Sequence, residues 1–197
     1  MKKLLHLGCG QKTKKDIIKY FHNNWSETRV DIDSKVSPDI LGSITNLSKI
    51  KNHSYDAIFT SHTIEHLFAH EVDIALKEFY RVLNNDGFVI ITCPDLKSIS
   101  KLVLEDKLLE VAYNSPAGPI TPLDMIYGYR KFIQKGNHYM AHKCGFTLKN
   151  LVGVLNYANF KSVLGFERQE AFDLWVVAKK KKIEKKVFSK FVNNIFN

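Results

Sequence analysis

A glycine-rich turn near the start of the chain is the first feature that could do chemistry. Gly8-Cys9-Gly10 directly follows an apolar run, Lys3–Leu7, of the kind found in buried strands. Glycines at the end of a strand let backbone N–H groups approach a ligand closely, and such turns commonly hold nucleotide-like molecules. Thr13 stands where G-x-G-x-x-G needs its third glycine, and no G-x-x-x-x-G-K-[ST] motif is present. The turn therefore favours neither a dinucleotide nor a nucleoside triphosphate.

Two acids follow the turn at a distance that suits the sugar of a nucleoside. Asp31 and Asp33 lie at the end of a second predicted strand, Thr28–Ile32, about 20 residues after the glycines. One carboxylate can accept hydrogen bonds from both hydroxyls of a ribose. A glycine turn with such an acid, but without a diphosphate fingerprint, indicates a nucleoside ligand.

Histidines form two groups whose residue types could bind a metal ion. The first group contains His62, Glu65, His66 and His70, and the second contains His138, His142 and Cys144. Imidazole, carboxylate and thiolate are ordinary ligands of zinc, but neither group has the additional ligand pair that makes a zinc motif specific. The alternative for both groups is a structural role, which for the second group is that of polar residues in the cover of a cleft. We predict no metal site.

The elements that position these residues alternate between strand-like and helix-like patterns over the first hundred residues. Strands are predicted at 3–7, 28–32, 39–44, 55–61 and 88–93, and helices at 12–21 and 71–83. Such alternation is typical of a parallel sheet with helices on both faces. Ligands of these sheets lie beyond the carboxyl ends of the strands, where the glycine turn and the acids also fall.

The pattern changes between residues 104 and 145, which contain three of the five prolines and many aromatic and polar residues. We interpret this segment as an insertion that covers the ligand cleft. Regular patterning returns with a predicted helix at 147–157 and two strands at 160–166 and 171–178. The last two strands are expected to form a hairpin that closes the sheet.

The net charge of +9 is concentrated at the end of the chain. Seven lysines against Glu184 put +6 on residues 179–197 and leave +3 on the other 178 residues. The nearly balanced charge of residues 1–178 argues against a nucleic-acid-binding groove on the domain. The three scattered cysteines favour a reduced, cytoplasmic setting, and no apolar run reaches the roughly 18 residues of a membrane span.

Five segments carry a resemblance to a known family. "LLHLGCGQ", "RVDIDS", "YDAIFTSHTIEHL", "EFYRVLNNDGFVIITCPDL" and "HKCGFTLKNLVGVLNYANF" resemble, in order and spacing over residues 3–178, the motifs of class I S-adenosylmethionine-dependent methyltransferases. The resemblance implies a Rossmann-like α/β fold, with a mostly parallel seven-stranded sheet and helices on both faces. It also implies S-adenosyl-L-methionine as cofactor. The family's usual helix before the first strand is absent, so we expect the insertion to supply one wall of the cofactor pocket.

The resemblance also implies roles for individual residues. The Gly8, Cys9 and Gly10 turn matches the turn beneath the methionine part of the cofactor, and Asp31 matches the ribose-binding acid, with Asp33 as the alternative. Ser43 and Ile44 fall beside the adenine, where serine departs from the family's usual acid, and Ser61 and His62 fall where the sulfonium and the acceptor meet.

Catalysis is assigned to two side chains. His62 is a candidate base or acceptor-positioning group, and Asp95 is a second candidate that could instead cap the next helix. The fourth strand ends in "TSHT" and not in the N/DPPY-type loop of amide- and base-nitrogen methylases. We therefore expect an oxygen acceptor on a small molecule or a sugar or glycan precursor. The alternatives are an RNA- or protein-directed methyltransferase, with the lysine-rich tail as its handle, and a cofactor-binding protein without transferase activity.

Residues 179–197 are treated as a basic tail after a domain at 1–178. Ile183, Val187, Phe191 and Ile195 recur every fourth residue, with Phe188, Val192 and Phe196 beside them. This broad apolar stripe predicts an amphipathic helix with lysines around it. The stripe could pack on the domain or on a second copy of the chain. It could also lie on the anionic inner face of a membrane. Attraction of the lysines to nucleic acid is a third alternative.

Overall fold

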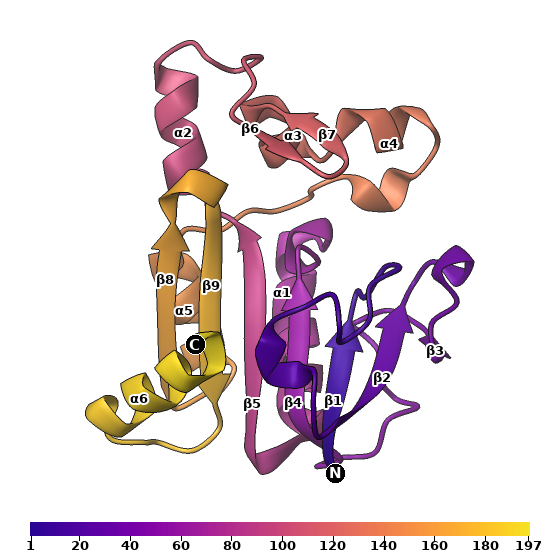
Figure 1. The fold of residues 1–197 in the computed structure, drawn as a ribbon, viewed down its shortest axis with the longest axis vertical. Coiled ribbons are helices and arrows are strands. Elements are labelled where there is room, and N and C mark those ends of the chain that lie inside the picture. Colours follow the sequence, from indigo (N-terminus) through magenta and orange to yellow (C-terminus); the bar gives the residue numbers. More distant parts are fainter.

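Seven strands form one sheet in the computed structural model, which describes residues 1–197, in the order β3-β2-β1-β4-β5-β9-β8 (Figure 1). The strands are β1 (Lys2–Leu7), β2 (Trp25–Asp31), β3 (Ile40–Leu41), β4 (Tyr55–Ser61), β5 (Leu83–Pro94), β8 (Ser162–Arg168) and β9 (Asp173–Lys179). The first five run parallel, and β9 pairs antiparallel with both β5 and β8. This arrangement confirms the predicted mostly parallel α/β sheet.

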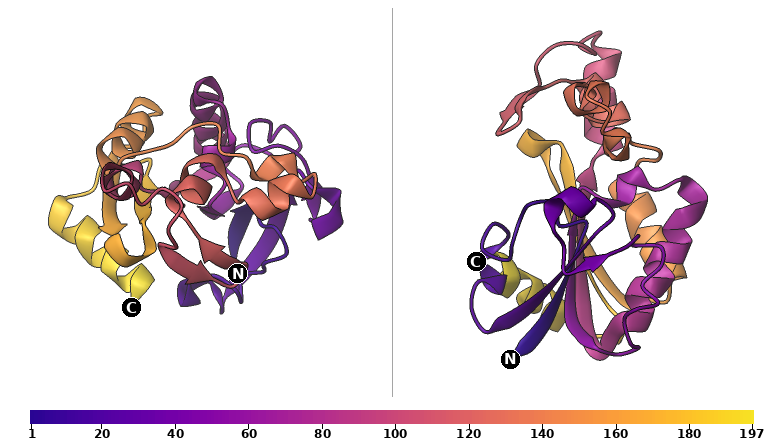
Figure 2. Two further views of the ribbon diagram at one scale, coloured as in Figure 1. Left: turned by 90° about the horizontal axis from the view of Figure 1, so that it is seen from above. Right: turned by 90° about the vertical axis from the view of Figure 1, so that its right-hand side faces the viewer.

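Helices cover both faces of the sheet (Figure 2, right). One face carries α1 (Ala69–Val82) and α5 (Leu148–Tyr157), and the other carries α6 (Lys185–Phe196). Side chains of a strand point alternately to the two faces, and β5 supplies both cores in this way. Val89 and Ile91 join the core beneath α1 and α5, whereas Phe88 and Ile90 join the core beneath α6. The central strands are therefore buried on both sides, as parallel sheets require.

The helix predicted at 12–21 is wrong, because the segment forms only a short 3-10 turn, η1 (Lys19–Phe21). Thr13 and Asp16 close a local turn instead: the backbone N–H and the hydroxyl of Thr13 both donate to the Asp16 carboxylate at 2.9 Å. Such side-chain bonds compete with helix formation. The segment is nevertheless anchored, since Phe21 is fully buried and its ring centroid lies 5.0 Å from that of Trp25.

Residues 96–146, which we call the lid, lie above the carboxyl ends of the strands (Figure 1). The lid contains α2 (Leu96–Leu104), β6 (Tyr113–Ser115), β7 (Gly118–Ile120), α3 (Pro122–Tyr127), α4 (Arg130–Gln134) and η4 (His138–Met140). It has a small core of its own, formed by Ile99, Ile120, Met125 and Tyr129. The lid is therefore an ordered subdomain that begins about one helix earlier than the predicted boundary at residue 104.

The end of the chain packs on the domain. In α6, Phe188, Val192 and Ile195 of the predicted stripe are buried against the sheet, whereas Val187 at its edge is 56% exposed. The apolar side of α6 covers the sheet face that would otherwise lack a helix, which agrees with the alternative that the stripe packs on the domain. No helix of the structure has the length and apolar character needed to cross a membrane.

Candidate functional site

A cavity of about 660 Å³ lies between the carboxyl ends of β1, β2 and β4 and the lid. Its predicted lining residues are Gly8, Gly10, Asp31, Asp33, Ser43, Ile44 and His62. From the lid it is lined by Phe132, Asn137, Tyr139, Met140 and Lys143. Residues predicted separately along the chain thus meet in one pocket, and the lid supplies a wall, as the insertion was expected to do.

The two glycines of the turn are needed for different reasons. Both adopt positive φ angles, +61° at Gly8 and +54° at Gly10, which side chains of other residues rarely tolerate. A Cβ on Gly8 would lie 2.3 Å from Oγ1 of Thr63, so this glycine allows the turn after β1 to lie against the segment that follows β4. A Cβ on Gly10 would meet nothing within 4 Å, because that position borders the pocket. Gly10 therefore leaves backbone accessible to a ligand.

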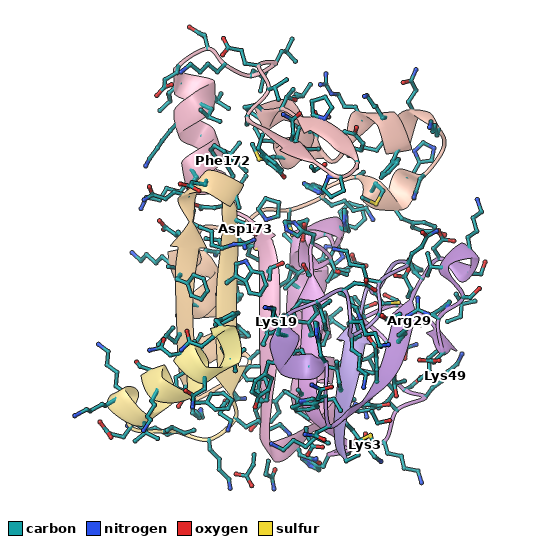
Figure 3. All side chains as sticks on the ribbon, in the orientation of Figure 1. Lys3, Lys19, Arg29, Lys49, Phe172 and Asp173 are labelled. Atoms are coloured by element: carbon teal, nitrogen blue, oxygen red, sulfur yellow. The ribbon has the colours of Figure 1, made fainter.

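Because no helix forms at residues 12–21, the glycine turn is held by polar side chains instead. The N–H of Gly10 donates to Oδ2 of Asp31 at 2.8 Å, and the N–H of Asp33 donates to Oδ1 at 2.9 Å. Arg29, labelled in Figure 3, donates from its guanidinium to four backbone carbonyls. These carbonyls belong to Gly10, Lys12, Val36 and Ser37, at 2.8 to 3.1 Å. The turn and the following loop are therefore fixed by β2 rather than by a helix of their own.

The two candidate ribose acids have different surroundings. Asp33 is the N-cap of η2 (Ser34–Val36) and accepts from the N–H of Lys35 at 2.9 Å. Asp31 ends β2 and accepts one N–H on each oxygen, which leaves acceptor capacity on both oxygens for ribose hydroxyls. Between them, Ile32 lines the pocket with an apolar side chain that is 49% exposed. Sequence reasoning missed Ile32, although an apolar residue directly after the last residue of a strand is a usable signal.

His62 is held in an unusual backbone conformation at the pocket. Its φ is +52°, and its N–H donates to the carbonyl of Thr92 at 2.9 Å. Left-handed conformations of non-glycine residues persist where the surroundings impose them, and they cluster at functional sites. The imidazole is 48% exposed and lies between two buried carboxylates, with Nδ1 3.3 Å from Glu65 and Nε2 3.9 Å from Asp173. Figure 3 shows Asp173 at the lid end of β9.

Glu65 belongs to η3 (Ile64–His66) and is a buried carboxylate surrounded by imidazoles. Burial acts to raise the pKa of Glu65, but the nearby His62, His66 and His142 outweigh it and hold the pKa below its ordinary value. Burial likewise acts to lower the pKa of His62, but the close contact with Glu65 and the charge of Asp173 raise it overall. An ionised carboxylate is therefore kept beneath the pocket.

Three predicted site residues do not line the pocket. Cys9 is 2% exposed, and burial raises the pKa of its thiol to about 11, which suits a packing residue. Ser61 exchanges a hydrogen bond with the hydroxyl of Thr92 at 2.8 Å. Asp95 is fully buried as the N-cap of α2 and accepts from the N–H groups of Lys97 and Ser98. The structure favours the capping role of Asp95 over the catalytic one.

In the fold, one histidine of the first group meets one histidine of the second, and the other members lie apart from them. His70 and His138 are exposed, and Cys144 directs its sulfur toward the carbonyl of Ile64 at 3.5 Å. His66 and His142 meet, with ring centroids 4.9 Å apart. The Glu65 carbonyl also accepts the N–H groups of residues 143 and 144, at 2.8 and 3.2 Å. The first group therefore connects η3 to residues 141–144, which lead from the lid back to the sheet.

Comparison with known proteins gives a sequence match over part of the chain and a shared fold. The sequence model described as "Methyltransferase domain" matches residues 5–91, which include the glycine turn, Asp31 and His62. No curated protein matches the chain.

Solved structures resemble the chain over most of its length. A SAM-dependent methyltransferase from Archaeoglobus fulgidus is 15% identical, with a TM-score of 0.59 over 91% of this chain and 86% of that one. The CMeT domain of the citrinin polyketide synthase is 12% identical with a TM-score of 0.60, and the match spans 92% of this chain but 47% of that one. The 1,6-didemethyltoxoflavin-N1-methyltransferase of Burkholderia thailandensis, solved with 1,6-didemethyltoxoflavin and S-adenosylhomocysteine, is 15% identical with a TM-score of 0.56, over 91% and 71% of the two chains.

Proposed function

We propose that this chain, a class I S-adenosylmethionine-dependent methyltransferase, transfers the methyl group to an oxygen of a small molecule or of a sugar or glycan precursor. The cofactor is S-adenosylmethionine. We place its ribose on Asp31, its adenine beside Ile32 and Ile44, and its methionine part over the turn at Gly10. Its methyl group then faces His62 and the lid.

The observation that carries the proposal for a small acceptor is the covered pocket. The lid places Phe132, Tyr139 and Met140 over the same cavity that the glycine turn and Asp31 line from below. About 660 Å³ is within the size of sites that bind small molecules and cofactors. A pocket of this size beneath an ordered subdomain suits a compact acceptor better than a polymer.

Methyl transfer from a sulfonium is an in-line displacement, and its leaving group is already activated by positive charge. The protein's main contribution is therefore to align the nucleophile, the methyl carbon and the sulfur. His62 is suited to this task because its backbone is fixed by Thr92 and its ring by the carboxylates of Glu65 and Asp173. We assign it the orientation of the acceptor hydroxyl by a hydrogen bond.

The alternatives receive less support from the structure. An RNA- or protein-directed enzyme would attract its acceptor with the lysines near the chain end. However, α6 lies on one face of the sheet, away from the lid that covers the pocket (Figure 1). A binding protein without transferase activity would not need the fixed His62 at the meeting point of pocket and lid.

The test is to incubate the protein with methyl-labelled S-adenosylmethionine and with cell extract separated into small-molecule, RNA and protein fractions. We expect label in the small-molecule fraction, lost with Asp31→Ala and retained with His70→Ala, whose exposed side chain lies outside the pocket. Label in RNA or protein alone would refute the proposed acceptor class. Cofactor binding without label in any fraction would favour the non-catalytic alternative.

A further inference from the structure

Three side chains from two distant segments of the chain converge beside the pocket. Glu65 and His66 come from η3, and His142 comes from the irregular segment that leads from the lid back to the sheet. One carboxylate oxygen and one ring nitrogen from each histidine all lie within 4.8 Å of one another. Two imidazoles and a carboxylate form a ligand set that first-row divalent metal ions prefer.

Each of the two imidazoles has its Nδ1 atom beside a backbone carbonyl oxygen. Nδ1 of His66 lies 3.1 Å from the carbonyl oxygen of Ala141, and Nδ1 of His142 lies 2.8 Å from that of Met125. A nitrogen that faces a carbonyl oxygen carries the proton, so Nε2 keeps its lone pair whenever the ring is neutral. Metal-binding histidines are oriented in this way, with the second nitrogen donating to a carbonyl or a carboxylate.

Glu65 lacks the partners that a buried carboxylate needs. Its side chain is 1% exposed, and neither oxygen accepts a hydrogen bond. The imidazole nitrogens of His62 and His142 approach to 3.3 and 4.0 Å. Buried charges are normally paired or coordinate a metal ion, so an unsatisfied one beside two imidazole lone pairs requires an explanation.

We propose that Glu65, His66 and His142 bind one divalent transition-metal ion through a carboxylate oxygen and two Nε2 atoms. Bonds of about 2.0–2.2 Å would place the ligand atoms closer together than they lie here, so each side chain would move inward by roughly 1 Å or less. His66 lines the pocket, while Glu65 and His142 lie behind it with side chains 1% and 11% exposed. The open coordination positions therefore face the pocket.

The ion would act on the acceptor, a role that rests on the proposed function. A hydroxyl bound to the metal loses its proton more readily than a free one, as metal-bound water does. The proton passes to water, and the oxygen attacks the methyl carbon. The carbon–sulfur bond then breaks with its electron pair remaining on sulfur, which yields the methyl ether and S-adenosylhomocysteine.

The site is tested by metal binding, without any need for turnover. Untagged protein is stripped with a chelator and titrated with Co²⁺, followed by visible absorption, and with Zn²⁺, followed by calorimetry. We expect one ion per chain and ligand-field bands typical of a site with four or five ligands. Glu65→Gln and His142→Gln should each weaken binding at least about tenfold. His138→Gln is the matched control, because His138 lies in the same lid but is exposed.

Circular dichroism and S-adenosylhomocysteine binding establish that each variant is folded. If the folded wild type binds no ion, or if His142→Gln binds as well as His138→Gln, the metal site is refuted whatever the activity. A metal-loaded protein that labels no acceptor refutes the proposed function alone. Undiminished methyl transfer by the stripped protein refutes the role of the ion in catalysis.

Discussion

Replacing Asp31 by alanine should weaken cofactor binding far more than the same change at Asp33. The Asp31 carboxylate accepts the N–H groups of Gly10 and Asp33 at 2.8 and 2.9 Å, and we assign it the ribose hydroxyls as well. Asp33 accepts only the N–H of Lys35, within its own 3-10 turn. The two substitutions thus remove the same group from neighbouring positions with different roles.

The magnitude follows from the contacts that are lost. A hydrogen bond to a charged group contributes about 1.5–3 kcal/mol, and water can partly replace the carboxylate at this half-buried position. We therefore expect Asp31→Ala to cost about 1–3 kcal/mol of binding free energy, or roughly 5- to 150-fold in Kd. Asp33→Ala should change Kd by less than about threefold, because its cap is partly exposed.

Calorimetric titration with S-adenosylhomocysteine measures both values, and thermal unfolding of the unliganded variants checks that the fold is intact. Asp31→Asn separates charge from shape, since it keeps the volume but halves the acceptor capacity. An unchanged Kd for Asp31→Ala together with a weakened Kd for Asp33→Ala would refute the ribose assignment. Binding of NAD in place of S-adenosylhomocysteine would refute the cofactor assignment itself.

Three further substitutions test the supports of the site. Arg29→Ala removes four hydrogen bonds to loop carbonyls, so hydrogen exchange should show faster exchange at the glycine turn and calorimetry a weaker cofactor affinity; an unaffected turn would contradict this bracing role. Phe188→Ala should lower the free energy of unfolding by about 3–5 kcal/mol and Val187→Ala by less than about 0.5, measured with urea, because only the first side chain is buried; equal effects would show that α6 does not pack as described. Burial acts to raise the pKa of Asp124, but hydrogen bonds led by that from Arg130 hold it at about 2, below the ordinary 3.8. Its ionised form therefore stabilises the lid by about 2 kcal/mol above pH 4 and loses this effect as the pH falls toward 2, so the stability difference between wild type and Asp124→Asn should shrink over that range; a constant difference would refute the assignment.

The sequence predicts the sheet well because strong local patterns agree with the tertiary structure. The apolar run at 55–61 is β4 at the predicted bounds, and Val72, Ala75, Leu76 and Phe79 are buried in α1 as their helical spacing indicates. The glycine turn and Asp31 were placed together because the carboxyl ends of parallel strands meet at one edge of the sheet. These inferences need only local periodicity and one topological rule.

The segment after β1 shows where local patterns fail. Ile17, Ile18 and Phe21 have helical spacing, but the side chains of Thr13 and Asp16 offer the backbone a competing turn. Propensity did not decide between these outcomes, and the contacts of Arg29 with the loop carbonyls could not be read from the sequence.

The cluster of Glu65, His66 and His142 shows what spacing along the sequence does not contain. The two histidine groups looked incomplete when each was judged by its own spacing. The lid carries His142 back to η3 across 76 residues of sequence, and hydrogen bonds to carbonyls then fix both ring orientations. The contact between His66 and His142 depends on the tertiary structure, so it cannot be predicted from local sequence patterns.

The central claim is that the pocket between the glycine turn, Asp31 and His62 seats the cofactor with its methyl group toward the lid. A crystal structure of the protein with S-adenosylhomocysteine tests this most directly. We predict both ribose hydroxyls on the Asp31 carboxylate, the homocysteine over Gly10 and the sulfur directed toward His62. S-adenosylhomocysteine bound outside this pocket, or with its sulfur directed away from His62 and the lid, would contradict the account.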